Sequence, residues 1–319
     1  MAIAEEPVAE ETVVAEGTIA EQARLDAARL AKQEAWRPRL PLLPALIFTI
    51  VVTQVPFLFT LWFSFNDYRL APPVGPELNF GDNYVALVQD SFFRDAAWTS
   101  FLMTTSSVIL SLLVGLGLAL LLDRKFFGQG LARTLLITPF LVMPVVAGLV
   151  WDLQILDTTF GVINWLLEAL GFDRVTFVGS FPLWSIVAVL VWQWSPFMML
   201  ILLAGLQGQN PSVLEAARVD GATPRGIFRQ ITLPHLRPFM ELGILLGAIY
   251  LVQVFDHIRV ITGGGPGSTN IPWFIFRRSI DGGNNFGQAS AYSIVVVIFT
   301  IILTTIGLRT LTNLLEDEG

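Results

Sequence analysis

The sequence predicts an all-α membrane protein with six transmembrane helices. Of its 319 residues 54% are apolar and only 14% are charged, and the mean hydropathy is +0.64. These values lie outside the range of soluble globular proteins. A bilayer core about 30 Å thick needs roughly 20 apolar residues per spanning helix. Six stretches meet this requirement, at about residues 41–65, 100–122, 134–153, 182–206, 238–258 and 289–314, and Pro139 and Pro144 interrupt the third.

These stretches divide the chain into four parts. Residues 1–38 are expected to form a cytoplasmic and largely disordered tail, because they begin with a low-complexity run of Ala, Glu, Val and Pro. The tail has neither a basic n-region nor a cleavage site, so no signal-peptide cleavage is expected. Residues 39–99 hold the first span and an outer loop, residues 100–314 hold the core membrane domain, and residues 315–319 form an acidic C-terminal tail.

Basic residues indicate the orientation in the membrane. Lys and Arg gather before the first span, between the second and third spans, and in the polar segment 210–234. Since basic residues near span ends favour the cytoplasm, both termini and that polar segment are predicted to be cytoplasmic. Arg259, Arg277 and Arg278 fall on the outer side and count against the rule, without outweighing the three clusters.

Small residues recur at every fourth position in two of the spans. Such faces let helix backbones approach closely in a membrane. Packing within this chain and packing against a partner subunit are both compatible with the pattern. The residues are Ser107, Ser111, Gly115 and Ala119 in the second span, and Gly243 and Gly247 in the fifth.

Several classes of chemistry lack the residues that they need. The chain has no cysteine, and its two lysines, Lys32 and Lys125, do not lie in a phosphate-binding loop. Its two histidines, His235 and His257, are expected to be ordinary interfacial residues at opposite membrane faces, which cannot together bind a metal. The sequence thus predicts no enzyme, no metal and no cofactor. The net charge of −7 says nothing about nucleic acid, and no nucleic-acid partner is expected.

Ion-coupled carriers usually need ionisable residues deep in the membrane. Here Asp152, Glu241 and Asp256 lie near span ends, and no relay at mid-membrane is visible. The energy for any transport is therefore expected to come from outside this chain.

The polar segment 210–234 reads NPSVLEAARVDGATPRGIFRQITLP and stands between two apolar stretches. Asn210-Pro211 is typical of a helix start. Gly221 can take the left-handed conformation that ends a helix. Thr223-Pro224 repeats the start signal, and Pro234 is expected to stop the second helix. We call this segment the elbow, because the pattern predicts two short helices joined at a glycine.

The charges of the elbow exclude it from hydrocarbon, yet its apolar side chains give it faces to bury. A docking element for another protein and a helical pair that lies on its own bundle are equally compatible with this pattern.

The elbow resembles the EAA loop in the membrane subunits of bacterial ABC importers. The match covers Glu215-Ala216-Ala217, three further residues, Gly221, nine further residues, and Ile231-x-Leu233-Pro234. The resemblance implies the transmembrane-domain fold of a type I ABC importer, with residues 100–314 as the core permease domain. It also implies that the elbow forms coupling helices in a groove of a separate cytoplasmic ATPase dimer. The ATPase-coupling residues would be Glu215, Ala216, Ala217, Asp220 and Gly221.

A path for a small polar substrate needs hydrogen-bonding side chains and aromatic faces inside the bundle. Two stretches supply them. The candidate substrate-path residues are Trp192, Gln193 and Trp194 in the fourth span and Tyr250, Gln253 and Asp256 in the fifth. The alternative is that the tryptophans pack between helices or anchor at the membrane interface.

Further stretches are similar to the carbohydrate branch of these importers, of the maltose and glycerol-phosphate type. Residues 262–269 and 286–291 look like signatures of sugar permeases, while residues 127–130, 143–151 and 192–196 look most like polyol (sorbitol/mannitol) permeases. The resemblance implies import of a polyol or related sugar by alternating access across the bacterial plasma membrane. It implies three protein partners: a homologous second permease, the ATPase dimer and an extracellular substrate-binding protein.

Two other readings of the sequence remain. One is a stand-alone secondary carrier or channel for small polar solutes, which would work without any ATPase. The other is a membrane scaffold or a polytopic membrane enzyme. The complete elbow motif argues against the first, and the absence of catalytic clusters weakens the enzyme.

Overall fold

The computed structural model describes residues 41–282 and 284–316. The predicted N-terminal tail and the last three residues of the predicted C-terminal tail lie outside the described residues. The chain divides into two compact units, Met1–Thr60 and Leu61–Gly319. Most of the first predicted span, α2 (Leu43–Ser64), belongs to the first unit, and its 22 residues include the apolar, exposed surface expected of a lipid-facing helix.

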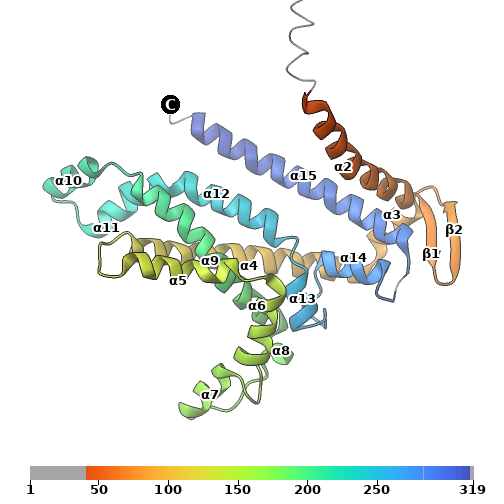
Figure 1. Cartoon of the computed structure of the whole chain (residues 1–319), viewed down its shortest axis with the longest axis horizontal. Helices are drawn as coiled ribbons and strands as arrows, with labels where there is room; N and C mark the ends of the chain where they lie inside the picture. Colours follow the sequence, from red (N-terminus) through yellow and green to blue (C-terminus); the bar gives the residue numbers. More distant parts are fainter. Residues whose placement is uncertain (1–40, 283, 317–319) are drawn as a thin grey trace, which may run out of the picture. The chain divides into compact units, whose positions relative to one another are not determined.

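The second unit is mostly helical (Figure 1). Its elements are β1 (Asn66–Leu70), β2 (Pro73–Leu78), α3 (Asp82–Gln89), α4 (Ser91–Leu122), α5 (Gln129–Leu141), α6 (Pro144–Val150), the π-helix η2 (Trp151–Ile155), α7 (Val162–Ala169), α8 (Phe177–Ser180), α9 (Pro182–Gln207), α10 (Pro211–Val219), α11 (Pro224–Ile227), the π-helix η3 (Phe228–Thr232), α12 (Leu233–Leu251), α13 (Asp256–Ile261), α14 (Ile271–Ser279) and α15 (Phe286–Glu316).

Helices α4 and α9 form the most extensive helix pair of this unit. The stripe of small residues on α4 lies at their contact: Ser107, Ser111 and Ala119 are fully buried. A Cβ atom added to Gly115 would come within 2.6 Å of the Met198 Cβ atom and 2.8 Å of the Met199 backbone nitrogen. The stripe therefore serves packing within this chain, which decides between the two alternatives that the sequence left open.

We expect Gly115→Leu to destabilise this helix pair, because the α9 backbone leaves no room for a side chain. Overpacking of this kind costs about 1–3 kcal/mol. The midpoint of thermal unfolding of the purified chain in detergent measures the loss. Gly117→Leu is the matched control, since a Cβ atom there meets nothing within 4 Å. Equal midpoints for the two variants would show that the close approach at Gly115 is not needed.

The helices of the structure agree with some of the predicted spans and differ from others. Among the described residues α2, α4 and α9 are long and apolar enough to cross a membrane, and α9 matches its prediction within a residue at each end. The third prediction corresponds to a pair, α5 and α6–η2, bent by 99° after Leu141. The interruption expected from Pro144 is thus confirmed, because Pro144 starts a new helix, whereas Pro139 lies inside α5 and does not interrupt it as expected.

The prediction for the fifth span was wrong at its C-terminal end. The sequence predicts an uninterrupted helix to residue 258, but α12 ends at Leu251 and a separate short helix, α13, begins at Asp256. Asn270 explains the break, since its buried side chain donates a hydrogen bond to the Val254 carbonyl oxygen that a continuous helix would have used. The sixth span corresponds to α15, and the count of six spans stays a prediction.

A two-stranded antiparallel hairpin, β1 and β2, occupies the predicted outer loop and was not expected. Its prolines and glycine interrupt the alternation of apolar and polar residues by which a strand is usually recognised in a sequence. The Asn83 side chain ties the loop to the first span by donating to the carbonyl oxygens of Ser64 (3.0 Å) and Asn66 (2.9 Å).

One buried carboxylate joins three helices beside this loop. Asp90 caps α4 by accepting hydrogen bonds from the backbone N–H groups of Phe92 (2.9 Å) and Phe93 (3.2 Å). The same side chain forms an ion pair with Arg278 of α14 and accepts a hydrogen bond from the Tyr292 hydroxyl of α15 at 3.2 Å. We call these three side chains the Asp90 cluster.

Candidate functional site

The elbow begins with a helix whose two ends are capped as expected. The Asn210 side chain accepts a hydrogen bond from the Ser212 N–H at 3.0 Å, and α10 follows. Gly221 has a φ of +83°, and its N–H bonds to the Arg218 carbonyl oxygen while the Ala222 N–H bonds to that of Ala217. This pair of backbone hydrogen bonds is the Schellman motif, in which a residue in the left-handed conformation ends a helix. The prediction for Gly221 is confirmed.

The second elbow helix starts as predicted and ends differently. The Thr223 side chain accepts a hydrogen bond from the Gly226 N–H at 3.2 Å, which caps α11. Pro234 was expected to stop this helix, but α11 continues through η3 into α12. The π-helical turn accommodates the proline, because the ladder of backbone bonds changes register where the missing N–H of Pro234 would have been needed. The second elbow helix is therefore continuous with α12.

Two side chains fasten the base of the elbow to the end of α9. The ring Nε2 of His235 lies 3.1 Å from the Gly205 carbonyl oxygen, and the Thr232 hydroxyl lies 3.4 Å from the Gln209 side-chain oxygen. Ile227 and Leu236 are buried beneath them. These contacts join the base of the elbow to α9, while η3 joins it directly to α12.

The predicted coupling residues lie on α10 and in the turn that follows it, at the end of the elbow away from α9 and α12. Glu215, Ala216, Asp220 and Gly221 are exposed and Ala217 is half-buried. Val213 and Val219 are also exposed, although both are apolar. In the part of the chain that the structure describes, Glu215 has no hydrogen bond or ion pair. This surface combines an unpaired carboxylate with exposed apolar side chains, a composition that suits docking to another protein.

The predicted substrate-path residues of α9 point in different directions. Gln193 is buried, and its Nε2 donates a hydrogen bond to the Val142 carbonyl oxygen at 2.7 Å. Its Oε1 lies 2.8 Å from Nε2 of His257 on α13. Gln193 thus bridges α9, the break between α5 and α6, and α13. The break leaves the Val142 carbonyl without a helical partner, and the amide supplies one.

His257 was expected to be an ordinary residue of the membrane interface, but the structure gives its side chain a specific buried partner. His257 is only 3% exposed and bonds to Gln193. The hydrogen bond between His257 and Gln193 could not be predicted from the sequence, because the two residues are 64 positions apart. The one available signal was the Gln193 amide itself, since an amide in an apolar span needs a buried hydrogen-bond partner.

The two tryptophans on either side of Gln193 have aromatic partners. The Trp192 ring packs edge-on against Trp151 at 5.8 Å between ring centroids. The Trp194 ring lies 5.5 Å from that of Tyr250, which brings together one residue from each predicted stretch. Both tryptophans pack between helices, as the alternative interpretation of the sequence allowed.

The remaining path residues lie around the break after α12. Tyr250 and Gln253 are exposed, and the Gln253 Nε2 donates to the Ile249 carbonyl oxygen at 2.9 Å. Asp256 is half-buried at the first position of α13, next to His257. The structure brings Trp194 and Tyr250 together, leaves Tyr250 and Gln253 exposed, and places Gln193 in the interior.

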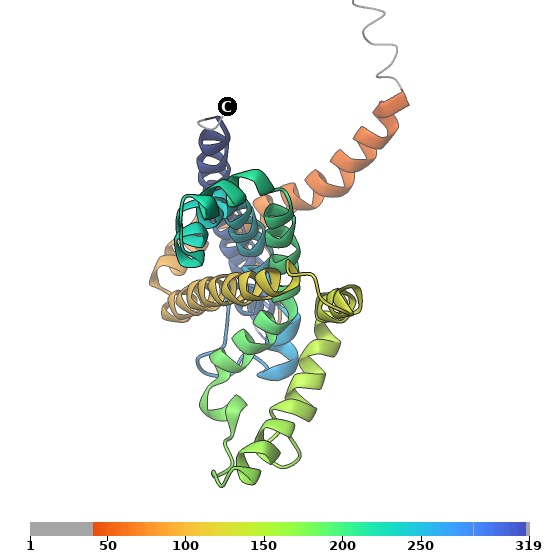
Figure 2. The same cartoon turned by 90° about the vertical axis from the view of Figure 1, so that its left-hand side faces the viewer.

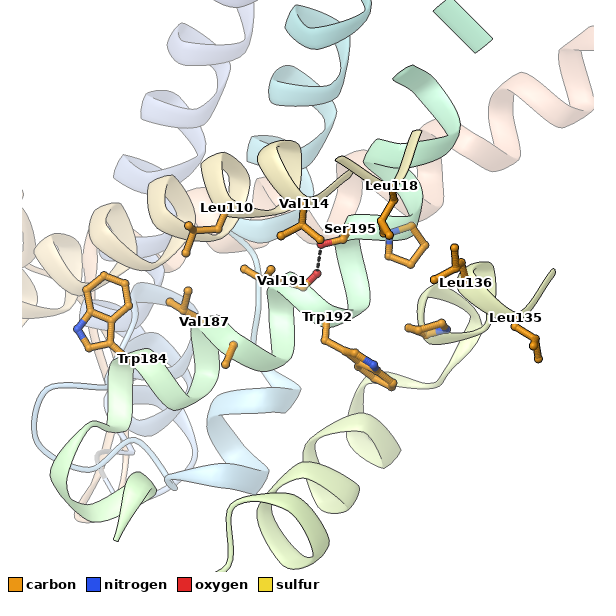
Figure 3. A pocket seen from close by; sticks show the side chains of 13 residues that line it. Leu110, Val114, Leu118, Leu135, Leu136, Trp184, Val187, Val191, Trp192 and Ser195 are labelled. Atoms are coloured by element: carbon orange, nitrogen blue, oxygen red, sulfur yellow. Dashed lines mark hydrogen bonds between the residues drawn. The ribbon is translucent and has the colours of Figure 1, made fainter. Parts of the chain in front are cut away.

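A groove of about 530 Å³ runs along α4, α5 and α9 (Figure 3). Figure 3 shows Leu110, Val187 and Val191 facing it, with the Trp192 ring at its edge and the Ser195 hydroxyl bonded to the Val191 carbonyl oxygen. The lining offers almost no free hydrogen-bonding group. This groove by itself is therefore unsuited to a sugar, whose hydroxyl groups need polar partners.

Comparisons with known proteins place the chain in a family. Residues 111–316 match the family described as "binding-protein-dependent transport system inner membrane component". The trehalose/maltose transport system permease protein MalF of Thermococcus litoralis is 32% identical over 285 residues, which cover 88% of this chain and 96% of that protein. The sn-glycerol-3-phosphate transport system permease protein UgpA of Escherichia coli is 29% identical, with 89% of this chain and 97% of that protein covered.

A solved structure shows the same fold. A bacterial ABC transporter involved in the import of the acidic polysaccharide alginate matches with a TM-score of 0.76 at 22% identity, covering 89% of this chain and 99% of that one. The type I ABC importer fold expected from the elbow is therefore confirmed. The chain belongs to the binding-protein-dependent transport system inner membrane components, as a multi-pass permease subunit of an ABC importer and not an enzyme.

Proposed function

We propose that this permease moves a polyol or a related sugar across the bacterial plasma membrane by alternating access, driven by a separate ATPase dimer that binds the elbow. The observation that carries the coupling role is the elbow itself. It exposes Glu215 at its free end, while His235 and Thr232 fasten its base to α9. Closure of an ATPase dimer on two such elbows would shift both α9 and α12 and so change access to the path.

The second permease completes the path in this proposal. Tyr250, whose ring packs against Trp194, and Gln253 are both exposed on the single chain. A homologous subunit facing them would enclose a cavity with polar and aromatic walls from both chains. A binding protein delivers ligand on the side opposite the elbow, and both termini face the cytoplasm with the elbow.

The substrate class rests on the relatives. Their names assign trehalose and maltose or sn-glycerol-3-phosphate to permeases that align over most of this chain. The test is the ATPase activity of this chain purified with its co-expressed subunits, with polyols and sugars presented by the binding protein. Stimulation by a polyol supports the proposal. Stimulation only by a non-carbohydrate, or solute movement by this chain alone, would contradict it.

We expect Gln253→Leu to weaken transport without loss of assembly. The Gln253 side chain is exposed and can bond to a substrate hydroxyl, and a hydrogen bond is worth about 1 kcal/mol. The half-saturation concentration should therefore rise about fivefold. Uptake into vesicles at a series of ligand concentrations measures it.

The contrasting variant is Gln193→Leu, which removes a buried amide. It leaves the Val142 carbonyl oxygen and His257 without their partner, so we expect a stability loss of about 1–3 kcal/mol. An unchanged half-saturation concentration in Gln253→Leu would remove that residue from the path. A stable Gln193→Leu variant with altered substrate affinity would support the prediction that Gln193 lines the path.

A further inference from the structure

Helix α7 turns an apolar face away from the rest of its own chain. Val162, Trp165, Leu166 and Ala169 recur at the spacing of one helical face, and all four are exposed. Trp165 is 68% exposed, and Phe160 and Phe172, just before and just after the helix, are 85% and 63% exposed. Exposed aromatic rings grouped in this way indicate a surface that contacts something other than water.

The polar face of α7 is satisfied by the loop around it. The Asn164 side chain is buried, donates to the carbonyl oxygens of Asp157 and Val175 and accepts from the Val175 N–H at 2.8 Å. Glu168 forms a two-bond ion pair with Arg174, at 2.7 and 3.0 Å. Arg174 lowers the pKa of the Glu168 carboxyl, so this face stays charged. The Glu168–Arg174 pair is exposed, so the three hydrogen bonds of the buried Asn164 side chain fix the orientation of α7 and leave its apolar face outward.

The position of α7 indicates what covers this face. The helix lies in the connection between η2, which ends at Ile155, and α9, which begins at Pro182, so a membrane segment adjoins it on each side. In Figures 1 and 2, α7 stands apart from the helices of the bundle, beyond α6 and on the side away from α10. Trp184, in the first turn of α9, is exposed as well, and tryptophan at span ends is typical of the bilayer interface.

We propose that α7 lies in the plane of the bilayer interface, with its apolar face among the lipid acyl chains of the leaflet at the start of α9. This is the outer leaflet in the orientation proposed above. The arrangement matches an interfacial amphipathic helix, which has Trp, Phe and Leu on one face and charged groups on the other. Because α7 follows the bent α5–α6 pair, the lipid contact holds the end of that pair at a constant depth.

Site-directed spin labelling tests the proposal cleanly, because the chain has no native cysteine. Leu166→Cys and Trp165→Cys place a nitroxide on the apolar face, and Glu168→Cys is the matched control two or three positions away on the polar face. The full-length chain, purified with the subunits that accompany it, is reconstituted in vesicles of phosphatidylethanolamine and phosphatidylglycerol. Collision rates of each nitroxide with molecular oxygen and with a water-soluble nickel chelate are then compared.

Lipid, water and protein surroundings give different results. We expect a several-fold higher ratio of oxygen to nickel collisions at the two apolar positions than at the control, because oxygen concentrates in the acyl region and the chelate does not enter it. High nickel collision rates at all three positions would overturn the proposal, since the face would be in water. Low rates with both reagents at the apolar positions would also overturn it, since the face would then be covered by protein.

Discussion

Glu215→Lys is expected to abolish ATP-driven uptake while the chain still inserts and assembles. Glu215 lies at the exposed end of the elbow and bonds to nothing in the described part of its own chain, so its replacement leaves the fold of α10 intact. A reversed charge at a docked surface costs several kcal/mol through like-charge contact and loss of the original partner. Even about 1.4 kcal/mol corresponds to a tenfold loss, so uptake should fall at least about tenfold.

The measurement compares uptake with ATP hydrolysis in the same vesicles. A coupling residue gives hydrolysis that no longer responds to loaded binding protein. Asp123→Lys is the matched control, because this exposed residue at the C-terminal end of α4 lies outside the elbow and undergoes the same change of charge. Normal uptake by Glu215→Lys, or an equal loss in Asp123→Lys, would remove Glu215 from the coupling role.

The parts of this protein that could be predicted are those encoded by neighbouring residues. The caps at Asn210 and Thr223 and the glycine end at Gly221 depend on backbone groups within a few positions, and all three were confirmed. The α9 span is a continuous apolar run, and its length fixed its ends. The type I importer fold followed from the elbow motif, a resemblance that the family match confirms.

Most of what could not be predicted depends on partners far along the chain, and one local exception is Pro234. Pro234 is a strong local stop signal, and only the π-helical turn before it shows why the helix continues. The break after α12 depends on Asn270, a residue 16 positions beyond Val254. Gln193 was predicted from its chemical type alone to line the substrate path, and this stays a prediction; its hydrogen-bond partners, Val142 and His257, could not be predicted. A sequence shows that a buried amide needs partners and does not show which ones.

The Asp90 cluster is a feature of this second kind, and breaking it should have the largest effect on stability. Asp90 and Arg278 are 188 residues apart in the sequence. The Asp90 side chain is only 8% exposed, and the Arg278 guanidinium also lies over the rings of Phe274 (5.4 Å) and Tyr292 (5.8 Å). Loss of the carboxylate would leave a cation among aromatic side chains without its counter-charge.

We expect Asp90→Ala to lower the free energy of unfolding by about 3–4 kcal/mol. Breaking a buried ion pair costs about 3–5 kcal/mol, and the one-third exposure of Arg278 places this pair at the lower end. Loss of the α4 cap adds about 1 kcal/mol. The exposed Asp95→Ala, one turn further along α4, should change stability by less than about 0.5 kcal/mol. Asp90→Asn, which can still cap α4, should fall between them. Equal unfolding midpoints for Asp90→Ala and Asp95→Ala in detergent would show that α4, α14 and α15 are held together without this carboxylate.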